Sequence, residues 1–174
     1  MHRRHAHVLL LLFGLLAGSA LLAPGKGKDF PWGDFKARSL QAVVALDLHA
    51  VARLAPKEAA VVLTGKELVL SKMTVIFSGL VRPLSRERRQ LLDRWAIQRD
   101  YAPEYVERYE NEYLFFEGEH KYWIAVQKSV APQLVQQIKE GKEVELYLLS
   151  GVGALRVEGR WNWLLLLQEF QLPP

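Results

Sequence analysis

The feature that most constrains the fold is an apolar run near the end of the chain, Trp161 to Leu167 (WNWLLLL). Successive side chains of an extended strand point to opposite faces, so this run offers apolar side chains to both. A strand exposed to water on one side alternates apolar and polar residues, whereas a strand covered on both sides reads as a continuous apolar run. We therefore expect a strand over 161–170 that lies between a barrel interior and a helix.

The periodicity of apolar residues and the positions of turn residues predict the secondary structure of the other segments. Apolar residues at helical spacing predict helices from Ser85, a suitable N-cap, to about Arg99, from Pro103 onward, and from 129 or 130 to Lys139. The stretch 39–54 suits a helix, although part of it alternates like a strand. Apolar and β-branched segments between turn residues predict strands at 60–70, 73–81, 113–117, 121–128 and 143–150, with a short one at 154–157.

The order of these elements predicts the fold class. Strands, one short helix and then two closing strands form the order of a five-stranded OB-type barrel, in which the helix connects the third and fourth strands. We expect a mainly β fold with helices, of the α+β class, built as a small OB-like five-stranded barrel in one globular domain, 37–174. The helical stretch 85–112 would be an insertion between strands two and three.

The N-terminal segment predicts export. Arg3 and Arg4 precede an uninterrupted apolar run from Val8 to Ala23, and the small residues around Ala20 suit a processing site. The run is shorter than the roughly 20 apolar residues that a membrane-spanning helix needs. We expect 1–23 to be a cleaved signal peptide, with a short anchor at 8–23 as the alternative, and 24–36 to be a linker. The protein would then work in the periplasm or cell envelope.

Composition argues against two classes of function. Removing residues 1–23 removes two arginines and no acidic residue, so the formal net charge falls from +4 to +2. A charge this small gives no reason to expect nucleic-acid binding. The chain has no cysteine, so neither disulfide bonds nor thiol chemistry is available to it.

Signs of catalysis are weak. Beyond residue 23 the only histidines are His49 and His120, which lie outside any metal-binding spacing, and no serine lies in a G-x-S-x-G motif. Glu117, Glu119 and His120 lie close together in a predicted hairpin and could bind a metal, or the two carboxylates could hydrolyse a polymer. A solvated loop is the simpler interpretation. We therefore expect no enzyme activity, no cofactor and no metal.

Two neighbouring segments carry opposite charge. Residues 82–99 have a net charge of +4, and residues 100–120 have a net charge of −6. The simpler interpretation is an internal pair of helices with complementary charges. The alternative is a binding surface, on which Arg86, Arg88 and Arg89 would contact anionic phospholipid head groups or an acidic partner.

Four tyrosines recur at intervals of four residues: Tyr101, Tyr105, Tyr109 and Tyr113. On a helix, side chains at this spacing lie on nearly the same face. Tyr105 and Tyr109 are therefore candidate contacts for a glycan or a peptide in a groove. The same stripe could pack the helix on the barrel, and we favour this second interpretation.

These observations predict a non-enzymatic exported protein of the cell envelope. It would be an OB-like binding or assembly module for a partner protein or an envelope polymer, with possible peripheral contact to an anionic membrane surface. The alternative is a hydrolase that cleaves an envelope polymer with carboxylates such as Glu117 and Glu119.

Overall fold

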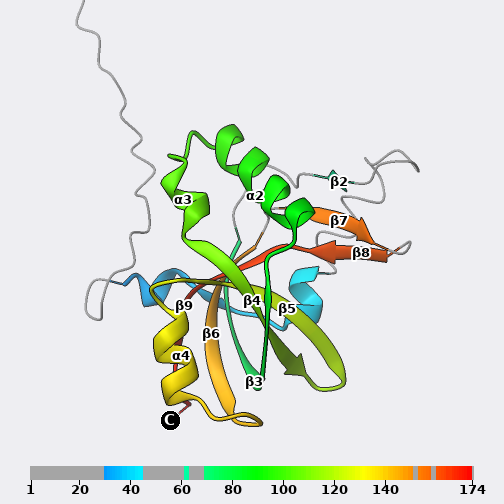
Figure 1. Ribbon diagram of the computed structural model, residues 1–174. Helices are drawn as coiled ribbons and strands as arrows, with labels where there is room; N and C mark the ends of the chain where they lie inside the picture. Colours follow the sequence, from blue (N-terminus) through cyan, green and yellow to red (C-terminus); the bar gives the residue numbers. More distant parts are fainter. Residues whose placement is uncertain (1–29, 45–60, 63–68, 151–152, 158–159, 174) are drawn as a thin grey trace, which may run out of the picture.

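The computed structural model describes residues 30–44, 61–62, 69–150, 153–157 and 160–173. The predicted signal peptide 1–23, the first part of the predicted linker and most of the predicted helix 39–54 lie outside these residues. The described part contains a closed five-stranded barrel of mixed strand direction, an extra strand and several helices (Figure 1). The expected α+β class with an OB-like barrel is confirmed.

The barrel strands pair in a ring: β3 (Val69–Pro83), β4 (Tyr109–Glu117), β5 (His120–Gln127), β6 (Glu143–Ser150) and β9 (Leu165–Gln171). β3 is antiparallel to β4 and to β6, β4 is antiparallel to β5, and β9 is antiparallel to β6. The ring closes because β5 and β9 pair in parallel. α4 (Ala131–Gln137) connects β5 to β6, which are the third and fourth barrel strands, as the sequence predicts.

The helical insertion consists of α2 (Arg86–Gln98) and α3 (Glu104–Glu107), which stand above one end of the barrel (Figure 1). It occupies the predicted part of the chain, but it connects the first and second barrel strands, β3 and β4. The difference arises in the predicted strand 60–70. Its described residues divide between β2 (Val61–Val62), which lies outside the barrel, and the start of β3.

β3 also runs through the break predicted at Ser71 and Lys72. Both residues pair with β6 on one edge of the strand and with β1 (Lys36–Ala37) on the other. Backbone pairing on two edges therefore holds this polar dipeptide in an extended conformation, which its side chains alone do not favour.

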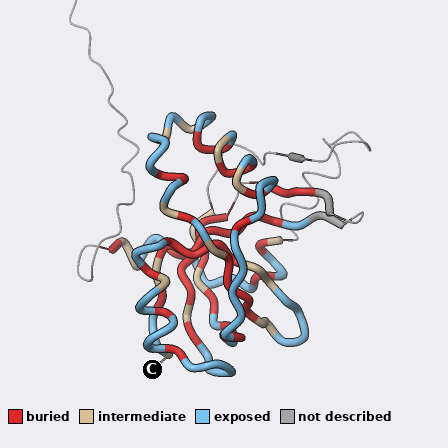
Figure 2. Tube along the Cα trace, viewed as in Figure 1, coloured by how far each residue is buried: buried red, intermediate tan, exposed pale blue. Residues whose placement is uncertain are grey.

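The apolar run 161–167 is split between two strands that pair with different partners. β8 (Arg160–Trp163) pairs with β7 (Ala154–Val157), whereas β9 begins at Leu165 and pairs with β5 and β6. Leu165 and Leu167 face the barrel interior, and Leu164 and Leu166 pack in a second cluster with α2 and α3. Burial on both faces is confirmed, and buried residues gather along the central strands (Figure 2).

The end of the predicted linker lies against the barrel. Phe30 and Phe35 are buried, and together with Trp32 they surround Tyr147 of β6, with ring centroids 4.6 to 6.0 Å from the Tyr147 ring. A short helix, η1 (Trp32–Asp34), and β1 follow this contact. Aromatic pairs at these distances stabilise packing, so residues 30–37 are part of the domain.

Candidate functional site

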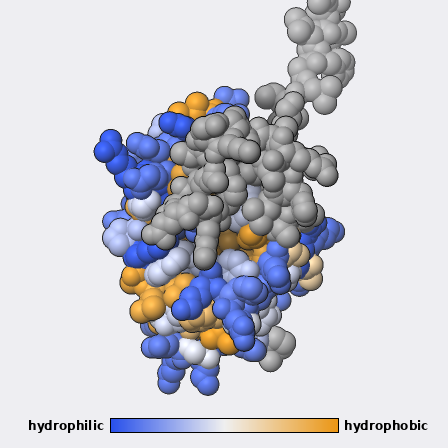
Figure 3. All heavy atoms as spheres, turned by 90° about the vertical axis from the view of Figure 1, so that its right-hand side faces the viewer, coloured by the Kyte–Doolittle hydropathy of each residue, from blue (hydrophilic) through white to orange (hydrophobic). Residues whose placement is uncertain are grey.

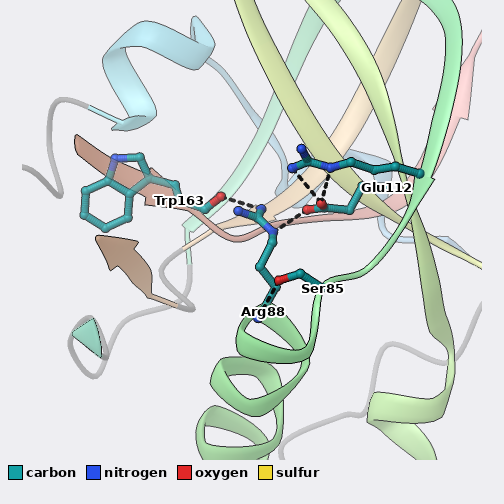
Figure 4. A network of polar contacts seen from close by, with 5 residues as sticks. Ser85, Arg88, Glu112 and Trp163 are labelled. Atoms are coloured by element: carbon teal, nitrogen blue, oxygen red, sulfur yellow. Dashed lines mark hydrogen bonds and ion pairs between the residues drawn. The ribbon is translucent and has the colours of Figure 1, made fainter. Parts of the chain in front are cut away.

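The start of α2 places one arginine inside the molecule. The Ser85 hydroxyl accepts a hydrogen bond from the Arg88 N–H at 3.3 Å, which confirms Ser85 as the N-cap of this helix. Arg88 lies in the first turn and is only 6% exposed. The Arg88 side chain leaves the helix toward Glu112 of the barrel (Figure 4).

Arg88 is part of a buried network of charges that we call the Arg82–Glu112–Arg88 network. Its Nε lies 2.5 Å from Glu112 Oε1, and its Nη2 donates to the Trp163 carbonyl at 2.8 Å (Figure 4). Arg82 donates from Nε at 3.0 Å, and its Nη2 lies 2.9 Å from the same Glu112 Oε2. The Glu112 side chain is fully buried. Two guanidinium groups therefore share one carboxylate, and the network keeps one surplus positive charge.

The pairing with Glu112 is what allows Arg88 to be charged in this position. Burial lowers the pKa of Arg88, and the Glu112 carboxylate opposes that effect. An unpaired buried charge would cost several kcal/mol, so the buried Arg88 needs the carboxylate. The predicted pairing of the basic and acidic segments is thus present here, but the acidic partner lies on strand β4 rather than on a second helix.

A pocket lies beside this network, between the start of β5 and β8. β9 pairs with β5 only from Ile124 to Val126, so the preceding residues of β5 extend beyond that pairing. The pocket has a volume of about 150 Å³. We call it the side pocket, and its lining residues are Val44, Arg82, Arg88, Lys121, Tyr122, Trp123, Asn162, Trp163 and Leu165.

The side pocket has one cationic wall and one apolar wall. The Arg82 guanidinium stacks over the Trp123 ring at 4.1 Å from its centroid, which fixes Arg82 at the pocket while its side chain stays 44% exposed. Lys121 is exposed on the neighbouring part of β5. On the other side, Trp163 and Leu165 belong to the hydrophobic core of the barrel. An occupant of the pocket would therefore meet positive charge and an apolar surface together.

The three arginines proposed from the sequence do not form a common surface. Arg86 is exposed, Arg88 is buried in the network, and Arg89 donates from Nη2 to the Tyr109 carbonyl at 3.1 Å. Of the three, only Arg88 lines the side pocket. The geometry gives no support to one arginine surface that contacts lipid head groups.

The tyrosine stripe predicted on one helix is wrong, because α3 ends at Glu107 and β4 begins at Tyr109. The rings still meet in space: the centroids of Tyr101 and Tyr105 are 4.7 Å apart, and those of Tyr105 and Tyr109 are 5.9 Å apart. Tyr105 is 4% exposed and Tyr109 is 0% exposed, and burial raises the pKa of both phenols. Both residues therefore pack in the core between the insertion and the barrel.

The carboxylates of the predicted hydrolase have separate surroundings. Glu117 accepts hydrogen bonds from the N–H groups of Leu40 and Gln41 at 2.8 and 3.0 Å, so it caps the helical residues 40–44. Glu119 and His120 are exposed at the β4–β5 turn, where Gly118 has a positive φ of 58°. Within the described ranges, no group of three or more potential ligands is arranged to hold a metal ion.

Sequence reasoning missed most of the side pocket. Arg82, Lys121, Trp123 and Trp163 come from distant parts of the chain, and none belongs to a motif. The only available signal was the presence of large aromatic residues next to cations on predicted strands. Arg82 and Glu112 come together because the register of β3 and β4 places them opposite each other, and that register is not visible in the sequence.

Comparison with protein-family models, with curated proteins and with solved structures returned no match for this chain. In the part of the chain that the structure describes, no helix is long and apolar enough to cross a membrane. The geometry of the site is therefore the basis for the functional argument.

Proposed function

We propose that this protein is a non-enzymatic binding module of the cell envelope, which holds an extended polymer at the side pocket. The observation that carries the proposal is the pocket itself, where a paired but positively charged network meets an apolar wall. Export through residues 1–23 is part of the proposal and rests on the sequence pattern described above.

The position of the pocket supports an extended ligand. OB-type barrels bind oligosaccharides and oligonucleotides on the face of their second and third strands and with the neighbouring loops. Here the second and third strands are β4 and β5, and the side pocket lies between β5, the insertion and β8. Figure 3 shows both hydrophilic and hydrophobic residues on one side of the molecule. An extended ligand is therefore inferred here by analogy from the fold.

The chemistry of the pocket supports binding over hydrolysis. A carboxylate acting as general acid or base must reach its substrate and exchange a proton with it. Both oxygens of Glu112 are contacted by arginines, and its side chain is fully buried. Glu117 is engaged as a helix cap. The hydrolase alternative would need a pair of accessible carboxylates that flank one bond, and no observation favours such a pair.

Co-sedimentation of the exported protein with insoluble envelope polymer tests the proposal. Lys121→Glu reverses a charge at the rim of the pocket and should reduce the bound fraction about tenfold, because the variant repels an anionic ligand. Lys139→Glu is the matched control, since this exposed lysine lies outside the pocket and its replacement should leave binding unchanged. Equal binding of the two variants would contradict the proposed site. Release of soluble polymer fragments would instead support the hydrolase.

A further inference from the structure

The charged side chains that line the side pocket offer a ligand hydrogen-bond donors. Arg82, Arg88 and Lys121 carry only donors at their charged ends. Both oxygens of Glu112 are already contacted by the arginines. An occupant must therefore bring acceptors of its own.

The charge of the site favours an anion. The network has one surplus positive charge, and Lys121 adds a second at the same pocket. Charges in a partly enclosed site are screened less than charges on an open surface. Arg88 is held by Glu112 and by the Trp163 carbonyl, so it loses little freedom when a ligand binds. A planar carboxylate fits the geometry of a guanidinium group.

The size of the pocket limits the occupant to one ring. Pockets for whole small-molecule ligands usually measure about 300 to 1,000 Å³. The side pocket measures about 150 Å³, which is close to the size of a cavity that holds a benzene ring. Val44, Trp163 and Leu165 supply an apolar wall for one face of such a ring. The occupant is thus a single unit, apolar on one face and acidic at one edge.

We infer that the side pocket binds one acidic sugar unit of the polymer. The carboxylate faces Arg82 and Arg88, and the C–H face of the ring packs on the apolar wall. This inference rests on the proposed function and names the class of its ligand. A single-stranded nucleic acid would require a positively charged groove along its backbone, and the chain carries little net charge for its length.

Calorimetric titration with two matched ligands tests the inference. The probes are a short oligogalacturonate and the same oligomer with its carboxylates converted to methyl esters, which keeps the sugar backbone and removes the charge. We expect the acid form to bind about tenfold more tightly or better, with an affinity that falls as salt is added. Equal affinity for the two forms would overturn the inference.

Substitutions at the side pocket test which residues contact the ligand. Arg82→Lys keeps the charge but loses the planar guanidinium group, so it should lower the affinity for the acid form about tenfold. Arg94→Lys, on the exposed part of α2, should leave this affinity unchanged. Wild-type affinity in the Arg82→Lys variant would overturn the assignment.

Two further measurements separate the inference from the proposed function. If the protein co-sediments with envelope polymer in a Lys121-dependent way but binds neither oligosaccharide, the proposed function stands and the acidic sugar is wrong. If it binds neither the envelope polymer nor the oligosaccharides, both are wrong. Arg82-dependent binding to anionic phospholipid vesicles or to an oligothymidylate, without sugar binding, would overturn the inference in favour of that other ligand class.

Discussion

Two buried polar networks each include a residue of β4, and they differ in charge and in access to solvent. Under the insertion, the Tyr109 hydroxyl accepts hydrogen bonds from the Gln168 and Gln127 amides at 2.8 and 3.3 Å. This network is neutral, and all three of its residues are buried. Beside the side pocket, the Arg82–Glu112–Arg88 network is charged, and Arg82 is 44% exposed.

The difference shows which buried polar groups serve the fold and which remain available to a ligand. Tyr109, Gln127 and Gln168 come from β4, β5 and β9, so their hydrogen bonds favour one register of three strands. The charged network also joins β3, α2 and β4. Its surplus positive charge is not neutralised within the network, and the partly exposed Arg82 can still contact a ligand. Changes in the neutral network should therefore alter stability, and changes in the charged network should alter both stability and binding.

The largest expected loss of stability comes from truncating the tyrosines of the core. Tyr109→Ala should lower the free energy of unfolding by about 3 to 5 kcal/mol, because it leaves a cavity and removes a partner of two buried amides. Tyr105→Ala should cost about 3 kcal/mol, since its ring is also buried. Denaturant melts measure both. Two variants as stable as wild type would return these tyrosines to the list of candidate ligand contacts.

Glu112→Gln should destabilise the protein by about 3 to 5 kcal/mol, because it leaves the buried Arg88 charge without its counter-charge. It should also change ligand binding, in contrast to the tyrosine variants. The double variant Glu112→Gln with Arg88→Met offers a sharper comparison, since removing both charges should restore part of the lost stability. Failure of the second substitution to restore any stability would mean that the charge pair is not the cause.

Tyr109→Phe distinguishes the contribution of the hydroxyl to stability from that of the ring. It keeps the apolar volume but removes the acceptor of two buried amide donors, so a loss of about 1 to 3 kcal/mol is expected. The same denaturant melts measure it, with Tyr101→Phe as the control on a less buried ring of the same stack. A loss equal to that of Tyr109→Ala would assign the whole effect to the hydrogen bonds.

The smallest expected effect is a pH dependence at Glu169, which lies opposite Tyr147 on β9. Burial raises the pKa of Glu169, although a hydrogen bond from the Phe170 N–H opposes this. A carboxyl with a raised pKa stabilises the fold below its unfolded pKa, and that contribution is lost as the pH rises through the folded pKa. Glu169→Gln should therefore be slightly more stable than wild type at neutral pH, by about a few tenths of a kcal/mol.

Melting curves at neutral and acidic pH measure this difference. The advantage of Glu169→Gln should shrink or disappear as the solution is acidified below the usual range of a glutamate pKa. A variant that is less stable than wild type at neutral pH would contradict the burial argument.

Local patterns were enough to predict elements whose neighbours in sequence are also their neighbours in space. The β4–β5 hairpin, α4 with the following β6, and the N-cap of α2 at Ser85 were predicted close to their observed positions. The double-sided burial of 164–167 was also predictable, because a continuous apolar run has no solvated face to offer. These features depend on the periodicity of apolar residues, on turn residues and on helix capping. All three signals are contained within short segments of the sequence.

Only the tertiary structure decided the conformation of Tyr109, the burial of Arg88 and the existence of the side pocket. Four-residue spacing placed Tyr109 on a helix, but pairing of β4 with β3 and β5 holds it in a strand. Glu112 meets Arg82 and Arg88 because strand register and helix direction bring them together across 30 and 24 positions of sequence. The energy of strand pairing and of these ion pairs depends on which distant segments come together in the fold. Secondary-structure propensity and apolar periodicity depend only on residues that are neighbours along the chain.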